Sequence, residues 1–278
     1  MFNNHLLNGV ALSPRKTGFG PVLFSGFLNE GLEAASQAQF DVVELSIRSV
    51  KDIDPIELNP RLLELNLKIS AIATGQACLF DSLCLGCDDS VIRARAVEHF
   101  KEITKLAVNL QARAVIIGGI RGRLSGTGDQ YKKAYDTGVR TIRECAQWTD
   151  SHGITLLIEP INRYETNWIY TASDGLALLD EIGNNSVMLL LDTFHMNIEE
   201  ASIPGAIEMT KDRLGYVHFA DNTRHAPGQG QTDFKSILKA LKKINYQGPI
   251  VAEVLPLPDD LTALNNTAEF WKTIPVED

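Results

Sequence analysis

Four ionisable residues in the second half of the chain each follow a short apolar run. An ionisable side chain at the end of a buried apolar strand costs free energy unless it has a hydrogen-bond partner or an opposite charge nearby. Asp192 by itself fits a helix N-cap better than a site, since Asp side chains commonly accept hydrogen bonds from the first N–H groups of a helix. The repetition along the chain favours a shared site instead. These four strand-end residues are Glu159 after ITLLI, Asp192 after MLLL, His218 after GYV and Glu253 after IVA.

The spacing of the strand-end residues predicts the fold. They lie 33, 26 and 35 residues apart, and each interval suits one strand, loop, helix and return loop. All strands run the same way in a barrel built from this repeat, so their carboxyl ends meet at one face. We therefore expect an α/β protein of the (β/α)8 TIM-barrel class in which the four residues converge. Residues 1–278 fit one such domain, because these barrels typically have about 250 residues.

The strand-end residues also predict a metal site. Three carboxylates and one imidazole in a small volume repel one another unless a cation lies between them. A set of ligands rich in oxygen, with a single histidine, suits Mn²⁺, Mg²⁺ or Co²⁺ better than a structural zinc site. We expect one divalent ion, with Mn²⁺ favoured.

Apolar runs alternate with helical patterns along the whole chain. The segment 74–87 is expected to be a long loop at the active face, and loops of this length commonly line or cover a site. Gln76 in this loop is a candidate substrate contact. Ser173 and Gly183 are interpreted as the start and stop of one helix. Strands are expected at 8–12, 40–46, 67–73, 114–117, 154–158, 187–191, 216–217 and 250–252, and helices at 30–38, 55–66, 89–110, 129–151 and 173–183, around Pro204, from Asp233 and from Thr262.

Composition excludes several classes of protein. A net charge of −9 disfavours a nucleic-acid partner, because phosphate binding depends on clusters of Lys and Arg. No apolar run approaches the roughly 20 residues that span a bilayer, and the first residues lack the pattern of a signal peptide. The pair Gly126-x-Gly128 lacks the strand and third glycine of a dinucleotide site. The four cysteines imply no disulfides, so we expect a cytoplasmic protein.

Several motifs resemble those of a known family. The segments IEPINRYETN (158–167), LDTFHMNIEE (191–200), HFADNTRHAPGQG (218–230) and VAEV (251–254) are similar to the sugar isomerase and epimerase family of xylose-isomerase-like barrels, within it to the ketose 3-epimerases. The N-terminal half matches more loosely, in VELSIR and AIATGQA. The latter segment, with VIIGGIRGR and VLPLP, looks most similar to the bacterial 5-keto-L-gluconate epimerases of that group.

The resemblance implies roles for individual residues. The four strand-end residues match the family's metal ligands, and Glu159 and Glu253 also match its paired acid and base. Independently of the resemblance, Glu44 ends a strand on the same face and is interpreted as a hydrogen-bonded wall residue rather than a fifth ligand. Arg121 and Arg123 would suit the carboxylate of a keto-acid, although solvated loop charges are the more ordinary interpretation. The positions that match substrate contacts are Glu165, His195 and Arg224.

The implied reaction inverts the carbon beside a ketone through an enediolate, with one glutamate on each face. The substrate would be a small ketose or keto-acid sugar, and the protein a homodimer or homotetramer. An aldose–ketose isomerase of the xylose- or hydroxypyruvate-isomerase kind would use the same site and remains an alternative. A non-catalytic sugar sensor would be expected to lose one of the paired glutamates. An apurinic endonuclease is disfavoured, because the third and fourth strands end in ATGQ and IGGI, which lack the histidines of a zinc cluster.

Overall fold

Eight parallel strands close into a barrel in chain order, with β8 paired to β1. The computed structural model describes residues 6–273. The (β/α)8 TIM barrel expected from the sequence is therefore confirmed. The strands are β1 (Asn8–Leu12), β2 (Val42–Ser46), β3 (Lys68–Ala73), β4 (Ala114–Ile117), β5 (Thr155–Ile158), β6 (Val187–Asp192), β7 (Leu214–Phe219) and β8 (Ile250–Ala252).

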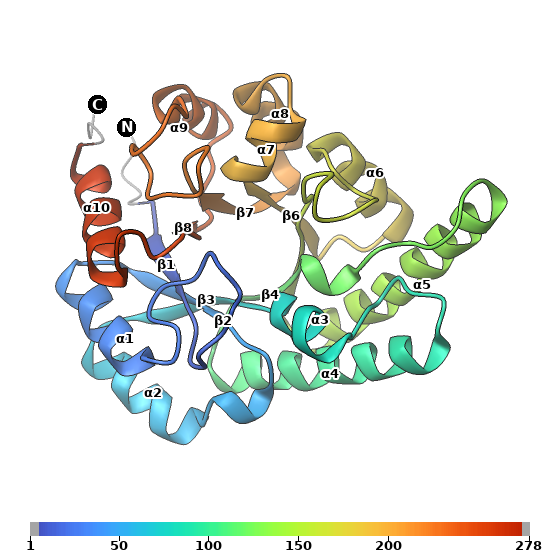
Figure 1. Ribbon diagram of the computed structural model, residues 1–278, viewed down its shortest axis with the longest axis horizontal. Helices are drawn as coiled ribbons and strands as arrows, with labels where there is room; N and C mark the ends of the chain where they lie inside the picture. Colours follow the sequence, from blue (N-terminus) through green and yellow to red (C-terminus); the bar gives the residue numbers. More distant parts are fainter. Residues whose placement is uncertain (1–5, 274–278) are drawn as a thin grey trace.

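The helices form a ring around the strands, as Figure 1 shows. Within residues 6–273 no helix combines the length and apolar character that crossing a bilayer requires. Short 3₁₀ helices lie at η1 (Val50–Asp52), η2 (Gly119–Arg121) and η3 (Lys211–Arg213). The α-helices are α1 (Leu28–Gln37), α2 (Pro55–Glu64), α3 (Gly75–Asp81), α4 (Ser90–Asn109), α5 (Asp129–Ser151), α6 (Ala172–Ile182), α7 (Thr193–Glu199), α8 (Ile203–Thr210), α9 (Phe234–Lys243) and α10 (Asp260–Thr273).

The strands are apolar on both faces because each face packs against a different core. In β4, Val115 and Ile117 pack outward with the helices. Ala114 and Ile116 point into the barrel, where they meet Leu157 and other inward side chains. Alternate residues of one strand thus serve two cores, and this explains why the strand sequences are continuous apolar runs. The barrel interior is filled, so polar groups gather at its carboxyl-terminal mouth.

Local signals account for most helix ends. Asp89 accepts hydrogen bonds from Val91 N and Ile92 N at the start of α4. The side chain of Asp233 caps α9, and Gly183 ends α6 in the left-handed conformation with φ of 68°. These three predictions are confirmed.

Other expectations about the elements were wrong. The segment 74–87 is not only a loop, because α3 occupies its first half. Helix α7 was not among the expected helices, although the N-cap interpretation of Asp192 is correct, since its side chain accepts a hydrogen bond from Phe194 N at the start of α7. The N-cap of α6 is Thr171 rather than Ser173, because Thr171 and Asp174 form a reciprocal capping box. The last helix begins at Asp260, before Thr262.

Candidate metal centre and active site

The strand-end residues meet at the mouth of the barrel. Glu159 and Glu253 follow β5 and β8, Asp192 is the last residue of β6, and His218 lies near the end of β7. All four are buried, and one ligand atom from each lies within 4.8 Å of the others. The convergence predicted from spacing is confirmed.

The geometry of this cluster fits a divalent cation. His218 Nδ1 lies 3.6 Å from Glu159 Oε1, 3.8 Å from Asp192 Oδ2 and 3.7 Å from Glu253 Oε2. Both His218 Nδ1 and Asp192 Oδ2 are buried without a hydrogen-bond partner. Buried polar atoms in native proteins are nearly always satisfied, and carboxylate oxygens with an imidazole nitrogen are donors for a divalent ion. The unpaired atoms are those that an ion would bind.

Opposite charges within the protein itself hold the cluster together. Burial disfavours the charged form of Glu159, but the nearby positive charge of His218, together with His195 and Arg224, lowers its pKa to about 2. Burial would lower the pKa of His218, but Glu44 and Glu159 raise it to about 10. At neutral pH the imidazole is therefore a cation among carboxylates.

Glu44 fixes the direction of His218. This residue of β2 is fully buried, and its Oε2 lies 2.8 Å from His218 Nε2. The contact leaves Nδ1 facing the other strand-end residues. A carboxylate behind a ligating histidine sets its tautomer and raises its basicity. The expectation that Glu44 is a hydrogen-bonded wall residue is confirmed.

His195 and Glu165 are joined by Asn162, which the sequence interpretation missed. Asn162 Nδ2 donates to Glu165 Oε1 and to His195 Nδ1, both at 2.8 Å. Because Nδ1 accepts, His195 Nε2 carries the proton, and it lies 3.9 Å from both Glu159 Oε1 and Asp192 Oδ2. Burial lowers the pKa of His195, so this residue presents a neutral N–H donor to the site.

Arg224, which is predicted to contact the substrate, lines the cavity and also contacts the carboxylates. Its guanidinium forms ion pairs with Glu253 and, at 2.8 Å, with Asp192 Oδ2. The contact with Asp192 lacks hydrogen-bond geometry. The guanidinium also lies 4.6 Å from the ring centroid of Phe194. Arg224 thus supplies positive charge beside the cluster.

Two further residues that the sequence interpretation missed shape the site. A Cβ at Gly118 would lie 2.3 Å from Glu159 Oε2, so only glycine lets this carboxylate adopt its position; the paired glycines after β4 were the available signal. Asp221 is buried and accepts from Gly228 N, Gly230 N and Thr232 N. It folds the loop that carries Arg224.

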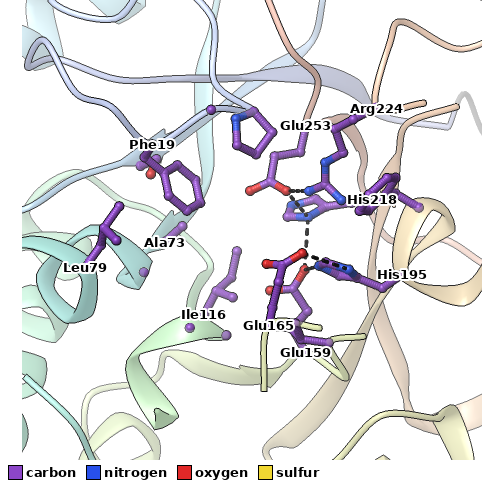
Figure 2. Close-up of a pocket in the computed structure, with 18 of the residues that line it drawn as sticks. Phe19, Ala73, Leu79, Ile116, Glu159, Glu165, His195, His218, Arg224 and Glu253 are labelled. Atoms are coloured by element: carbon purple, nitrogen blue, oxygen red, sulfur yellow. Dashed lines mark hydrogen bonds and ion pairs between the residues drawn. The ribbon is translucent and has the colours of Figure 1, made fainter. Parts of the chain in front are cut away.

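Glu159, His218 and Glu253 line one side of a cavity of about 470 Å³, a size typical of small-molecule sites. Figure 2 shows the ionisable side chains on one side and an apolar wall across from them. The apolar side chains that the figure labels are Phe19, Ala73, Leu79 and Ile116.

Three other candidates have different surroundings. Gln76 is fully buried and is not among the residues that line the cavity; its Nε2 donates to Ser13 Oγ, Ser46 O and Ser46 Oγ. Arg121 is neither a solvated loop charge nor exposed to a substrate carboxylate, because it is fully buried and donates to backbone carbonyls; both expectations for it were wrong. Arg123 is exposed and donates to Tyr164 O.

Metal binding should release one proton from His218. Below the raised pKa of about 10 the metal-free imidazole is protonated, whereas a metal ligand must be neutral. The apparent Mn²⁺ affinity should therefore rise about tenfold per pH unit near neutral pH. Calorimetry in buffers of different ionisation enthalpy counts the protons released, and a count of zero would contradict this protonation state.

Glu44→Gln should weaken Mn²⁺ binding. The substitution keeps the shape but removes the charge that orients His218, and losses of roughly 10–100-fold in affinity follow such changes. Titration calorimetry measures the effect, and Glu57→Gln on the exposed surface of α2 is the control. Wild-type affinity in a folded Glu44→Gln protein would show that Glu44 does not act through the metal ligand.

Comparison with known proteins adds independent evidence. A family model described as a xylose isomerase-like TIM barrel matches residues 32–274. The chain is 33% identical over 253 residues to an L-ribulose 3-epimerase of Mesorhizobium japonicum, covering 89% of this chain and 82% of the relative. It is 31% identical over 247 residues to an L-ribulose 3-epimerase of Methylomonas sp., covering 88% of this chain and 84% of the relative.

A solved structure has the same architecture. The crystal structure of a D-allulose 3-epimerase from Methylomonas sp. superposes with a TM-score of 0.81 at 27% identity, covering 98% of both chains. The fold, the buried cluster and the relatives thus all indicate the same family. This chain belongs to the xylose isomerase-like TIM-barrel family, and its relatives over most of its length are ketose 3-epimerases.

Proposed function

We propose that this protein is a metal-dependent 3-epimerase of ketose sugars. One observation carries the proposal: two buried glutamates, Glu159 and Glu253, approach His218 from opposite sides of the site (Figure 2). Inversion beside a ketone needs a proton removed from one face of a carbon and returned to the other. Two carboxylates on opposite sides of a flat intermediate suit this task.

The strand-end residues would hold one divalent ion, with Mn²⁺ favoured and Mg²⁺ or Co²⁺ also suitable. Bound there, the ion would stabilise the negative charge that develops on the ketone oxygen. The lowered pKa of Glu159 keeps this carboxylate ionised at neutral pH, as a proton acceptor must be. Glu253 would act on the other face, while His195 Nε2 and Glu165 would contact hydroxyl groups of the sugar.

The cavity favours a neutral ketose over a keto-acid. Among its described lining residues Arg224 provides the guanidinium, and Asp192 and Glu253 already neutralise it. The opposite wall is formed largely by apolar side chains and glycines. A carboxylate on the sugar would therefore lack a free cation. The relatives act on L-ribulose and D-allulose by name, and a neutral ketopentose or ketohexose is the substrate we propose.

The other expectations stand as proposals. The aldose–ketose isomerase alternative would use the same enediolate, so product analysis rather than geometry separates it. A cytoplasmic location and assembly into a homodimer or homotetramer also remain predictions. The acidic charge and the sugar-sized cavity support a small-molecule partner rather than nucleic acid.

A panel of substrates tests the activity. With Mn²⁺ present, L-ribulose and D-allulose should be converted to their C3 epimers, while 5-keto-L-gluconate should react more slowly because its carboxylate meets no free cation. Chromatography identifies the products. An aldose product would establish the isomerase alternative, and faster conversion of the keto-acid would refute the neutral-ketose assignment.

Glu159→Gln and Glu253→Gln should each abolish epimerisation. An amide cannot accept the substrate proton, and loss of a positioned acid–base group typically costs 10²–10⁴-fold. NMR in D₂O follows both product formation and deuterium incorporation at C3. Glu208→Gln is the control, because Glu208 pairs with Lys243 on the surface. Wild-type turnover in either site variant would exclude the two-glutamate scheme.

A further inference from the structure

Arg121 is a buried cation that forms no ion pair with any residue that the structure describes. Its side chain is fully buried, and no carboxylate of residues 6–273 lies within ion-pair distance of it. Buried arginines are normally paired with acids. Because no ion pair explains the burial of this charge, the backbone groups that Arg121 contacts are the evidence for its role.

The guanidinium of Arg121 joins the two ends of one loop. Nη1 donates to Glu159 O, at the start of the β5–α6 loop (residues 159–171). Nη2 donates to Trp168 O at 3.3 Å and Ile169 O at 3.0 Å, near the end of that loop. The same loop carries Glu165. Arg121 therefore holds the backbone of a strand-end glutamate and closes the segment that follows it.

The far end of this loop is strained. Ile169 has φ of 60°, a left-handed conformation that is an outlier for a β-branched residue. Its carbonyl accepts from Arg121 Nη2 and also from Ile161 N at 3.1 Å. Strained residues persist only where the surroundings fix them. The contacts of Arg121 are part of what holds Ile169 in place.

Only an arginine can make this set of contacts. The planar guanidinium presents donors in a fixed fork, whereas the lysine ammonium is a single point on a flexible stem. Trp168 packs beside the fork, with its ring centroid 6.0 Å from the guanidinium carbon, and Trp168 Nε1 donates to Gly122 O at 3.0 Å. The β4–α5 and β5–α6 loops are thus locked to each other around this side chain.

We propose that Arg121 is a positioning residue that sets the direction of the Glu159 carboxylate by clamping the β5–α6 loop. This inference rests on the proposed function, since Glu159 is there both metal ligand and proton acceptor. Loss of the clamp would let the loop relax, which would loosen Glu159 at one end and Glu165 within it. The expected defect is in metal binding and turnover more than in folding.

The test compares Arg121→Lys and Arg121→Ala with Arg95→Ala, a control on α4 whose side chain is exposed. Both Arg121 variants should weaken Mn²⁺ binding by about tenfold, as loss of groups that orient ligands commonly does, and should lower kcat more than they raise KM. Millimolar guanidinium should restore both properties in Arg121→Ala but not in Arg121→Lys. The control should match the wild type.

Hydrogen exchange provides a readout independent of the reaction. Amides of residues 159–169 should exchange faster in the Arg121 variants, and guanidinium should restore their protection in Arg121→Ala. Arg121→Lys keeps the charge and most of the volume, so it serves if the alanine variant does not fold. A folded Arg121→Lys protein with wild-type Mn²⁺ affinity, kcat and loop protection would overturn the proposal, as would a lowered melting temperature alone.

Failure of the proposed function gives a different result. If the wild-type protein epimerises no ketose, the activity assignment fails, while altered loop exchange in Arg121→Lys would still establish the clamp. If the wild type is active and the Arg121 variants equal it, only the clamp is refuted.

Discussion

Compensation of buried negative charge is the constraint on which this structure depends. Glu159, Asp192 and Glu253 lie within a few ångströms of one another at the barrel mouth, where their mutual repulsion is poorly screened. His218 and Arg224 offset this repulsion by ion pairs. The centre therefore contains its own counter-charges, and these must rearrange or lose a proton when a metal ion enters.

The barrel strands fix the positions of the strand-end residues, and the loops that follow them fix the orientations of the other side chains in the site. Each strand-end residue is held by a strand whose inward and outward side chains are both packed. Beyond the strands, buried polar residues hold the loops: Asp221 organises the segment bearing Arg224, and Asn162 links Glu165 to His195. Their partners are mostly backbone atoms or neighbours on the same loop. A functional site is thus supported by residues that do no chemistry.

Much of this arrangement could be predicted from the sequence. The apolar runs and their spacing predict the strand order, because a parallel barrel repeats one unit. The same spacing predicts that the four strand-end residues meet at one mouth of the barrel. The burial of Arg121 and Gln76 could not be predicted, because Arg121 lies in η2 and Gln76 in α3, and both are enclosed by segments that meet only in the folded chain. Helix α7 was missed because Asp192 both ends a strand and caps the helix.

Closure of the barrel has a consequence for how the centre assembles. β1 pairs with β8, so segments about 240 residues apart in the chain must meet before the ring is complete. Glu253 follows β8 and emerges from the ribosome after the other three strand-end residues. Until then the metal centre lacks Glu253, and the barrel that encloses the other three strand-end residues is still open. Contacts of such long range form slowly, so the ability to capture an ion arrives late, as one of the last events of folding.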